Sequence, residues 1–154
     1  MSGVASARLA AFLAAWPYAR FLGMEARLEG GTMTAVLPFA PHLVGNPLIP
    51  ALHGGVVAGF LEMTALAELA GAAPDGHAPR TVDITIDYLR PARALTTFAR
   101  AEVIKRGRRV INLQATAWQD SPATPVATLR GHFVVGAQST DPLIPAERRD
   151  ERIL

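Results

Sequence analysis

Two stretches of the chain carry apolar residues with helical spacing. Near the N-terminus the large apolar residues stand at positions i, i+3, i+4 and i+7, namely Leu9, Phe12, Leu13 and Trp16. This spacing predicts an amphipathic helix over about residues 6–20, with Ser6 as its N-cap. A second helix is predicted from about Gly54 to Gly71. It is apolar on nearly every side, so other parts of the fold must surround it.

The rest of the apolar pattern indicates strands. Two strands are predicted around the Gly30–Gly31 turn, within about residues 23–39. Four more follow the long helix, over about residues 80–89, 95–105, 109–119 and 125–136. In the first of these four, one predicted buried face consists of Val82, Ile84, Ile86 and Tyr88. Consecutive strands beside a segregated helix indicate an α+β fold, with an antiparallel sheet curled around that helix.

Composition narrows the class of protein. The chain has 154 residues, of which 50% are hydrophobic and 18% charged, as expected for one folded domain over residues 1–154 with a charged tail over about residues 137–154. The formal net charge is only +2, so we expect no nucleic-acid partner. There is no cysteine, which suits a cytoplasmic location and excludes disulfides and thiolate chemistry. No apolar run is long enough to predict a membrane span.

Glu62 is the candidate for chemistry, because it stands inside the apolar helix. Its neighbours at helical spacing carry no charge, so no local ion pair explains it. Either it lies on an exposed seam as an ordinary surface charge, or it is a functional acid. Gly59, one turn earlier, is unfavourable in a helix by about 1 kcal/mol relative to alanine, which suggests a close approach by another group. Glu68, near the helix end, is predicted to be solvated.

The start of this helix is a second candidate. Gly54 and Gly55 would present free N–H groups to a substrate carbonyl and stabilise an oxyanion. Glu62 lies seven positions after Gly55, which corresponds to roughly 10 Å along the helix axis and is far for one compact substrate. The geometry works more easily if a second subunit supplies one of the two parts. His53 is predicted to order the loop through a hydrogen bond rather than to act as a base.

Other chemistries find little support. The histidines have no metal-ligand spacing, so no metal site is predicted. Phe60 stands where a phosphate-binding loop needs lysine, and no G-x-S-x-G motif is present.

The segment "HGG" followed by an acid nine positions after the histidine, with Asn46 upstream, resembles the hotdog-fold acyl-CoA thioesterases. Within them it is most similar to the PaaI-like and 4-hydroxybenzoyl-CoA thioesterase group. The resemblance runs from about Gly23 to Val135 and includes "VDITIDYLRPA", "AEVIKRGRRVINLQATAWQ" and "ATLRGHFVV". One departure is Leu66, which stands where one branch of the group has a threonine one turn after the acid.

This resemblance implies a hotdog fold, in which a curved antiparallel sheet wraps around a long central helix. It implies a homodimer, assembled further into a homotetramer, with the active sites at the subunit interface. Glu62 would be the nucleophile or general base, and the N–H of Gly54 or Gly55 would polarise the thioester carbonyl. Asn46 and His53 would belong to the substrate site. No cofactor is implied, because coenzyme A is part of the substrate.

Basic residues offer a site for the coenzyme A phosphates. They are Arg90 and Arg93 after one strand, and Lys105, Arg106 and Arg108 around Gly107. The second group would serve equally well as a solvated hairpin tip. Two alternatives to acyl- or aryl-CoA hydrolysis stay open: a hotdog dehydratase of hydroxyacyl thioesters, for which His42 looks too far upstream of the acid, and a non-catalytic acyl-CoA-binding module.

Overall fold

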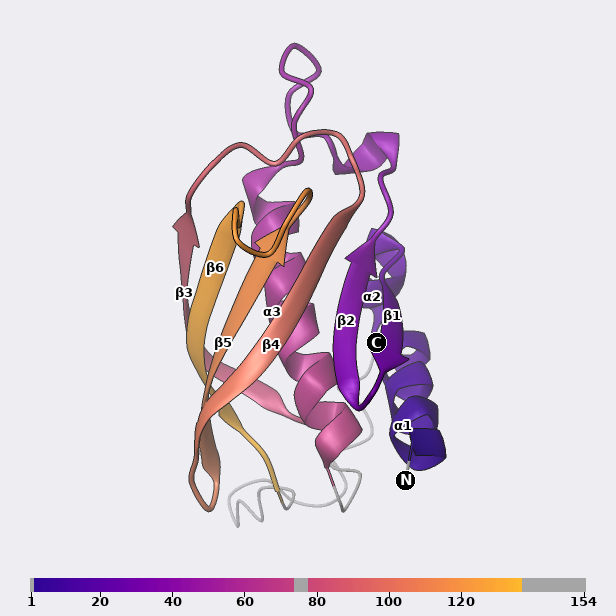
Figure 1. Cartoon of the computed structure of the whole chain (residues 1–154), viewed down its shortest axis with the longest axis vertical. Coiled ribbons are helices and arrows are strands. Elements are labelled where there is room, and N and C mark those ends of the chain that lie inside the picture. Colours follow the sequence, from indigo (N-terminus) through magenta and orange to yellow (C-terminus); the bar gives the residue numbers. More distant parts are fainter. Residues whose placement is uncertain (1, 74–77, 137–154) are drawn as a thin grey trace, which may run out of the picture.

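The computed structural model describes residues 2–73 and 78–136, which form one antiparallel sheet and three α-helices. The sheet has six strands in the order β1-β2-β4-β5-β6-β3 (Figure 1). The strands are β1 Glu25–Glu29, β2 Thr32–Leu37, β3 Arg80–Tyr88, β4 Thr97–Arg106, β5 Val110–Trp118 and β6 Ala127–Val134. The helices are α1 Ser2–Ala15, α2 Pro17–Leu22 and α3 Gly54–Ala72, with a short 3-10 turn, η1, at Pro41–Leu43.

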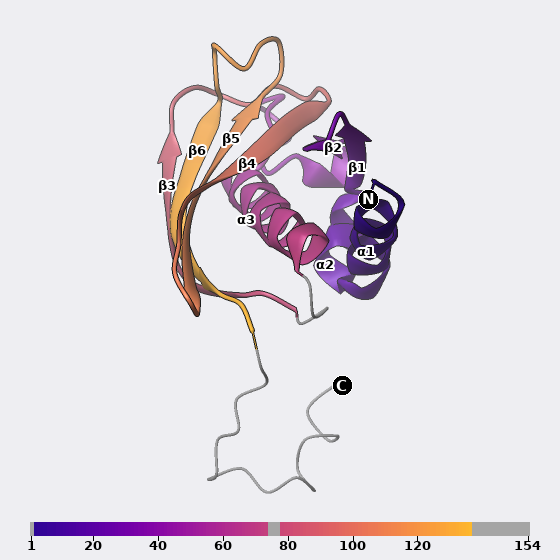
Figure 2. The same cartoon turned by 60° about the horizontal axis from the view of Figure 1, so that its bottom comes forward.

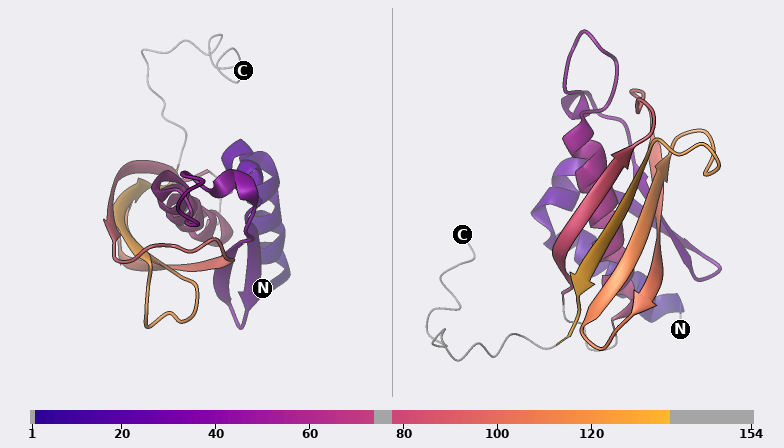
Figure 3. Two further views of the ribbon diagram at one scale, coloured as in Figure 1. Left: turned by 90° about the horizontal axis from the view of Figure 1, so that it is seen from above. Right: turned by 90° about the vertical axis from the view of Figure 1, so that its left-hand side faces the viewer.

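The sheet curves around α3, which is the centre of the core (Figures 2 and 3). Phe60, Leu61 and Ala65 of α3 have no exposed surface, and they pack against apolar side chains from the sheet. The α+β class and the sheet wrapped around a long helix are therefore confirmed. The expectation that no segment is long and apolar enough to span a membrane is wrong for α3, which passes by length and composition alone. However, 56% of its apolar window is buried inside the fold, as in a core helix.

The predicted bounds of the N-terminal helix are wrong. The structure has two helices in place of one over residues 6–20, and the first begins before Ser6, which therefore caps nothing. The break falls at Trp16, whose extended backbone (φ −90°, ψ 109°) is the conformation favoured before a proline. Pro17 then starts α2, where its missing N–H costs no hydrogen bond. Leu9 and Phe12 are buried as expected, and both helices lie beside α3 where the sheet leaves it uncovered (Figure 2).

The other elements agree closely with the pattern. β1 and β2 form the predicted hairpin, and Gly30 and Gly31 adopt the positive φ values, 56° and 82°, that its tight turn requires. α3 covers the predicted range, and the four later strands are all present. The predicted tail over residues 137–154 lies outside the described residues.

The buried face predicted for β3 is wrong at two positions. Val82 and Tyr88 are 58% and 57% exposed, whereas Ile84 and Ile86 pack against the core. The cause at Val82 is a β-bulge, because the register shifts between Thr81 and Asp83. Val82 is the extra residue, and Thr81 pairs instead with the fully buried Phe133 and shares its inward face.

Candidate active site

Glu62 lies on a narrow seam of α3. Ala58, Gly59 and Glu62 are partly exposed there, while the residues on the other faces of this stretch of helix are buried. The seam runs between β3 on one side of α3 and α2 on the other (Figures 2 and 3). Glu62 is therefore neither a fully solvated charge nor a buried one, and its carboxylate has to be held by other elements.

Thr81 is the residue that holds Glu62. Its Oγ1 donates a hydrogen bond of 2.6 Å to Oε1 of Glu62. The contact exists because the bulge in β3 turns Thr81 inward. Sequence reasoning missed this residue, since the period-2 pattern assigned Thr81 to the outer face. Leu66, which stands where one branch of the similar group has a threonine, is buried in the core.

The start of α3 leaves one N–H group free. The Nδ1 atom of His53 accepts a hydrogen bond of 2.9 Å from the Gly55 N–H, so His53 is the N-cap of the helix. The predicted loop-ordering role of His53 is confirmed, and the Gly55 N–H already has an acceptor within the chain. Within residues 2–73 and 78–136, the Gly54 N–H meets no acceptor. The Gly54 N–H is therefore the free donor at the start of the helix.

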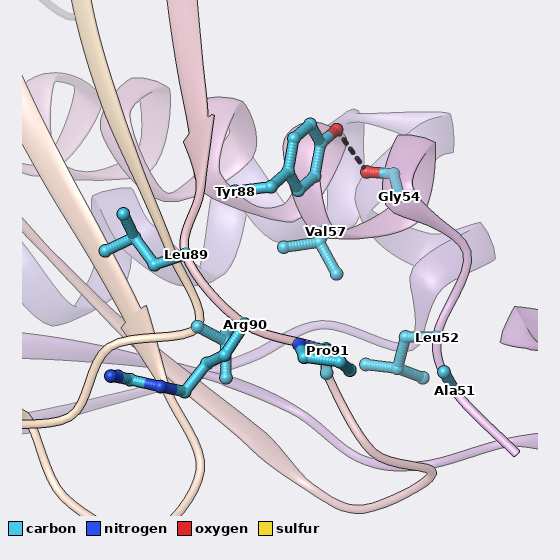
Figure 4. A pocket seen from close by; sticks show the side chains of 10 residues that line it. Ala51, Leu52, Gly54, Val57, Tyr88, Leu89, Arg90 and Pro91 are labelled. Atoms are coloured by element: carbon cyan, nitrogen blue, oxygen red, sulfur yellow. Dashed lines mark hydrogen bonds between the residues drawn. The ribbon is translucent and has the colours of Figure 1, made fainter.

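A cavity of about 350 Å³ opens beside Gly54 (Figure 4). The hydroxyl of Tyr88 donates a hydrogen bond of 2.8 Å to the Gly54 carbonyl and fixes one wall. Leu52 and Val57 supply apolar surface, and Arg90 lies across the cavity from Gly54. A neighbouring hollow of about 300 Å³ shares Arg90 and adds Arg93, so both arginines adjoin one continuous surface.

The predicted phosphate-binding residues fall into two separate groups. Arg90 donates to the carbonyl of Pro125, and Arg93 forms an ion pair with Asp120 at 2.5 Å. These two lie near the start of α3, whereas the β4–β5 hairpin, with Lys105, Arg106 and Arg108, lies at the far end of the sheet (Figure 1). One chain therefore does not bring the two groups to one nucleotide.

The remaining candidate residues shape loops. The side-chain oxygen of Asn46 accepts the N–H of Leu48, at the turn of the loop that projects beyond the sheet at the top of Figure 1. His42 contacts the carbonyl oxygen of Phe21 at 3.0 Å through Nε2, so it is engaged away from Glu62. In the described ranges, no group of three or more histidine, aspartate or glutamate side chains could hold a metal ion.

Two titratable groups near α3 have shifted pKa values. Burial, and then the charge of Glu62, raises the pKa of Tyr18. Burial raises the pKa of Glu68, which lines a cavity of about 130 Å³ between α1 and the end of α3. The prediction that Glu68 is solvated therefore holds only in part: Glu68 is partly exposed, and residues of α1 line the same cavity.

Comparison with known proteins identifies the family of this chain. Residues 50–126, which include His53, Gly54, Glu62 and Thr81, match the model of the thioesterase superfamily. The medium/long-chain acyl-CoA thioesterase YigI of Escherichia coli K12 is 31% identical over 108 residues, which cover 61% of this chain and 70% of that protein.

Solved structures share the fold. A Chromobacterium violaceum protein is 37% identical with a TM-score of 0.69, covering 88% of this chain and 98% of its own. A Bacillus halodurans protein solved with CoA is 26% identical with a TM-score of 0.71, covering 88% and 91%. The family match and the 31% identity to YigI show that this chain belongs to the thioesterase superfamily.

Proposed function

We propose that this protein hydrolyses acyl-CoA thioesters and that the carboxylate of Glu62 is the general base or nucleophile. The observation that carries this proposal is the carboxylate of Glu62, held by Thr81 on the half-exposed seam of an otherwise apolar helix. The name of the Escherichia coli relative, a medium/long-chain acyl-CoA thioesterase, favours fatty acyl groups as substrates.

The two oxygens of Glu62 have different roles in this proposal. Oε1 accepts the Thr81 hydrogen bond, so Oε2 is left to accept a proton from water or to attack the thioester carbon directly. In the general-base route, the water oxygen bonds to the acyl carbon as its proton moves to Glu62. The C–S bond then breaks, and the proton passes from Glu62 to the coenzyme A sulfur. The Gly54 N–H stabilises the negative charge that develops on the carbonyl oxygen.

We further propose that each active site is shared between two chains of a homodimer. Eight residues separate Gly54 from Glu62 along α3, which corresponds to about 12 Å of helix rise. This is too far for both groups to touch one thioester within a chain. A second copy packed along the seam would bring its Gly54 N–H toward the Glu62 of the first. Assembly of such dimers into a homotetramer is part of the same proposal.

Coenzyme A would enter through the cavity beside Gly54. Its walls of Leu52, Val57 and Tyr88 suit the pantetheine arm, and Arg90 and Arg93 at its mouth suit the phosphates. The basic β4–β5 hairpin, which lies at the other end of the sheet, would contribute only from another subunit.

Replacing the carboxylate by an amide tests this proposal. Glu62→Gln removes the proton acceptor while preserving shape, and we expect kcat for thiol release from acyl-CoA substrates to fall by about 10²- to 10⁴-fold. Glu68→Gln, on the same helix but facing the cavity under α1, is the matched control and should keep the wild-type rate. A wild-type rate in Glu62→Gln would contradict the role of Glu62. An enoyl product without thiol release would indicate the dehydratase alternative.

A further inference from the structure

Glu62 has a second neighbour with a polar hydrogen, on the α2 side of the seam. Tyr18 belongs to α2, whereas Thr81 comes from β3, and the two elements flank α3 on different sides (Figures 2 and 3). The helix that carries Tyr18 is anchored by the buried side chains of Ala19 and Leu22. Tyr18 is 38% exposed, and its phenol ring stacks on Phe21 with ring centroids 6.0 Å apart. Tyr18 is thus fixed at the edge of the proposed active site.

Gly59 explains how Tyr18 comes so close to α3. A Cβ atom at position 59 would lie 2.5 Å from Cε1 and 2.6 Å from Oη of Tyr18, so the phenol rests directly on the helix backbone. The close approach expected from a glycine in mid-helix is therefore confirmed. Gly59 lies three residues before Glu62, on the same face of the helix. The phenol hydroxyl therefore lies against α3 one helical turn before Glu62, on the same face.

The two groups interact through space without touching. Burial, and then the charge of Glu62, raises the pKa of Tyr18, so the phenol lies within electrostatic range of the carboxylate. No hydrogen bond joins the Tyr18 hydroxyl to Glu62 in the described part of the chain, where the carboxylate accepts from Thr81 alone. Two polar groups that face one space without a direct hydrogen bond are commonly bridged by a water molecule.

We propose that Tyr18 is a positioning residue that holds the hydrolytic water beside Glu62; this rests on the thioesterase function proposed above. The water would donate one proton to Oε2 of Glu62 and accept a hydrogen bond from the Tyr18 hydroxyl. One lone pair of the water oxygen then remains to attack the acyl carbon. The phenol neither gains nor loses a proton, so the balance of the hydrolysis is unchanged.

Tyr18→Phe tests this directly, because it keeps the ring on Gly59 and removes only the hydroxyl. We expect kcat for acyl-CoA hydrolysis to fall about tenfold while KM changes less than about twofold, since the water is lost and the substrate contacts are kept. Phe39→Leu, which removes another partly exposed ring, between β2 and η1, but no polar atom, is the control and should keep kcat within about twofold. An unchanged kcat in Tyr18→Phe, or a rise in KM alone, would overturn the proposal.

A second readout does not depend on turnover. Glu62→Gln removes the charge that raises the pKa of Tyr18, so this pKa should fall in the variant. The ultraviolet absorbance of tyrosinate measures it, and of the two tyrosines in the chain Tyr18 is the one whose transition Tyr18→Phe abolishes. An unmoved Tyr18 transition would overturn the placement of the phenol beside Glu62. A wild-type hydrolysis rate in Glu62→Gln would instead contradict the proposed function.

Discussion

Two glutamates on α3, Glu62 and Glu68, meet opposite surroundings although six residues separate them. Glu62 reaches the seam, where the Thr81 hydroxyl donates to it. Glu68 is partly exposed and lines a small, mainly apolar cavity with residues of α1. Burial raises the pKa of Glu68, so its ionised form destabilises the fold. The same residue type is thus the proposed catalytic group at one position and lowers stability at the other.

The unfavourable burial of ionised Glu68 predicts that the stability of the fold depends on pH. The pKa of Glu68 is higher in the folded state than in the unfolded state, so the folded protein binds this proton more tightly. The free energy of unfolding therefore falls as the pH rises from the unfolded-state pKa through the folded-state pKa. Glu68→Gln removes the ionisable group, so Tm at neutral pH should rise by on the order of 2 °C. Below about pH 4 both proteins carry a neutral group, and the difference should vanish. Thermal unfolding at the two pH values checks this, and an equal or lower Tm at neutral pH would contradict it.

At the scale of elements, the site depends on one irregularity in a strand. The bulge between Thr81 and Asp83 makes Val82 the extra residue and turns Thr81 toward Glu62. A regular strand would have placed Val82 inside and Thr81 outside. Bulges at sheet edges commonly redirect a side chain in this way. Because β3 is an edge strand, the bulge disturbs its pairing with only one neighbouring strand, β6.

Removing the Thr81 hydroxyl should slow hydrolysis. A hydrogen bond to a charged group contributes about 1.5–3 kcal/mol, so Thr81→Val should lower kcat/KM at least about tenfold as the carboxylate loses its orientation. Thr81→Ser keeps the hydroxyl and should stay within about threefold of wild type. Steady-state kinetics of thiol release measures both. Equal rates in Thr81→Val and Thr81→Ser would show that this hydrogen bond does not orient Glu62.

The sequence pattern predicts these elements well wherever local rules decide them. Glycine pairs mark the β1–β2 turn, and the apolar composition of α3 requires a surrounding sheet. Glu62 and Gly54 stand out because a charge inside an apolar helix and a glycine at its start are local anomalies. Thr81 and Tyr18 do not stand out, because their roles depend on a register shift and on where α2 packs. Such contacts between distant segments leave no periodic signal.

For the whole molecule, the proposed function requires two copies of the chain for each active site. The Gly54 N–H and the Glu62 carboxylate are separated along α3 by about 12 Å of helix rise. β3 forms the outer edge of the sheet beside the seam, with Val82 exposed on it. A second copy of the chain against this edge and seam would cover exposed apolar surface and supply the missing half of each site.

Complementation between two inactive variants tests the shared site most directly. Glu62→Gln removes the acid. Gly54→Pro removes one N–H and is compatible with the first turn of a helix and with the extended backbone of His53 (φ −59°, ψ 135°). In a mixed dimer, one site would combine the intact Gly54 of one chain with the intact Glu62 of the other.

The measurement is the rate of acyl-CoA hydrolysis by the two variants co-expressed with different affinity tags and purified through both, so that only mixed assemblies remain. One of the two sites in each mixed dimer would be intact, so we expect about half of the wild-type activity per dimer, far above either variant alone. Activity no greater than that of the separate variants would contradict a site shared between chains.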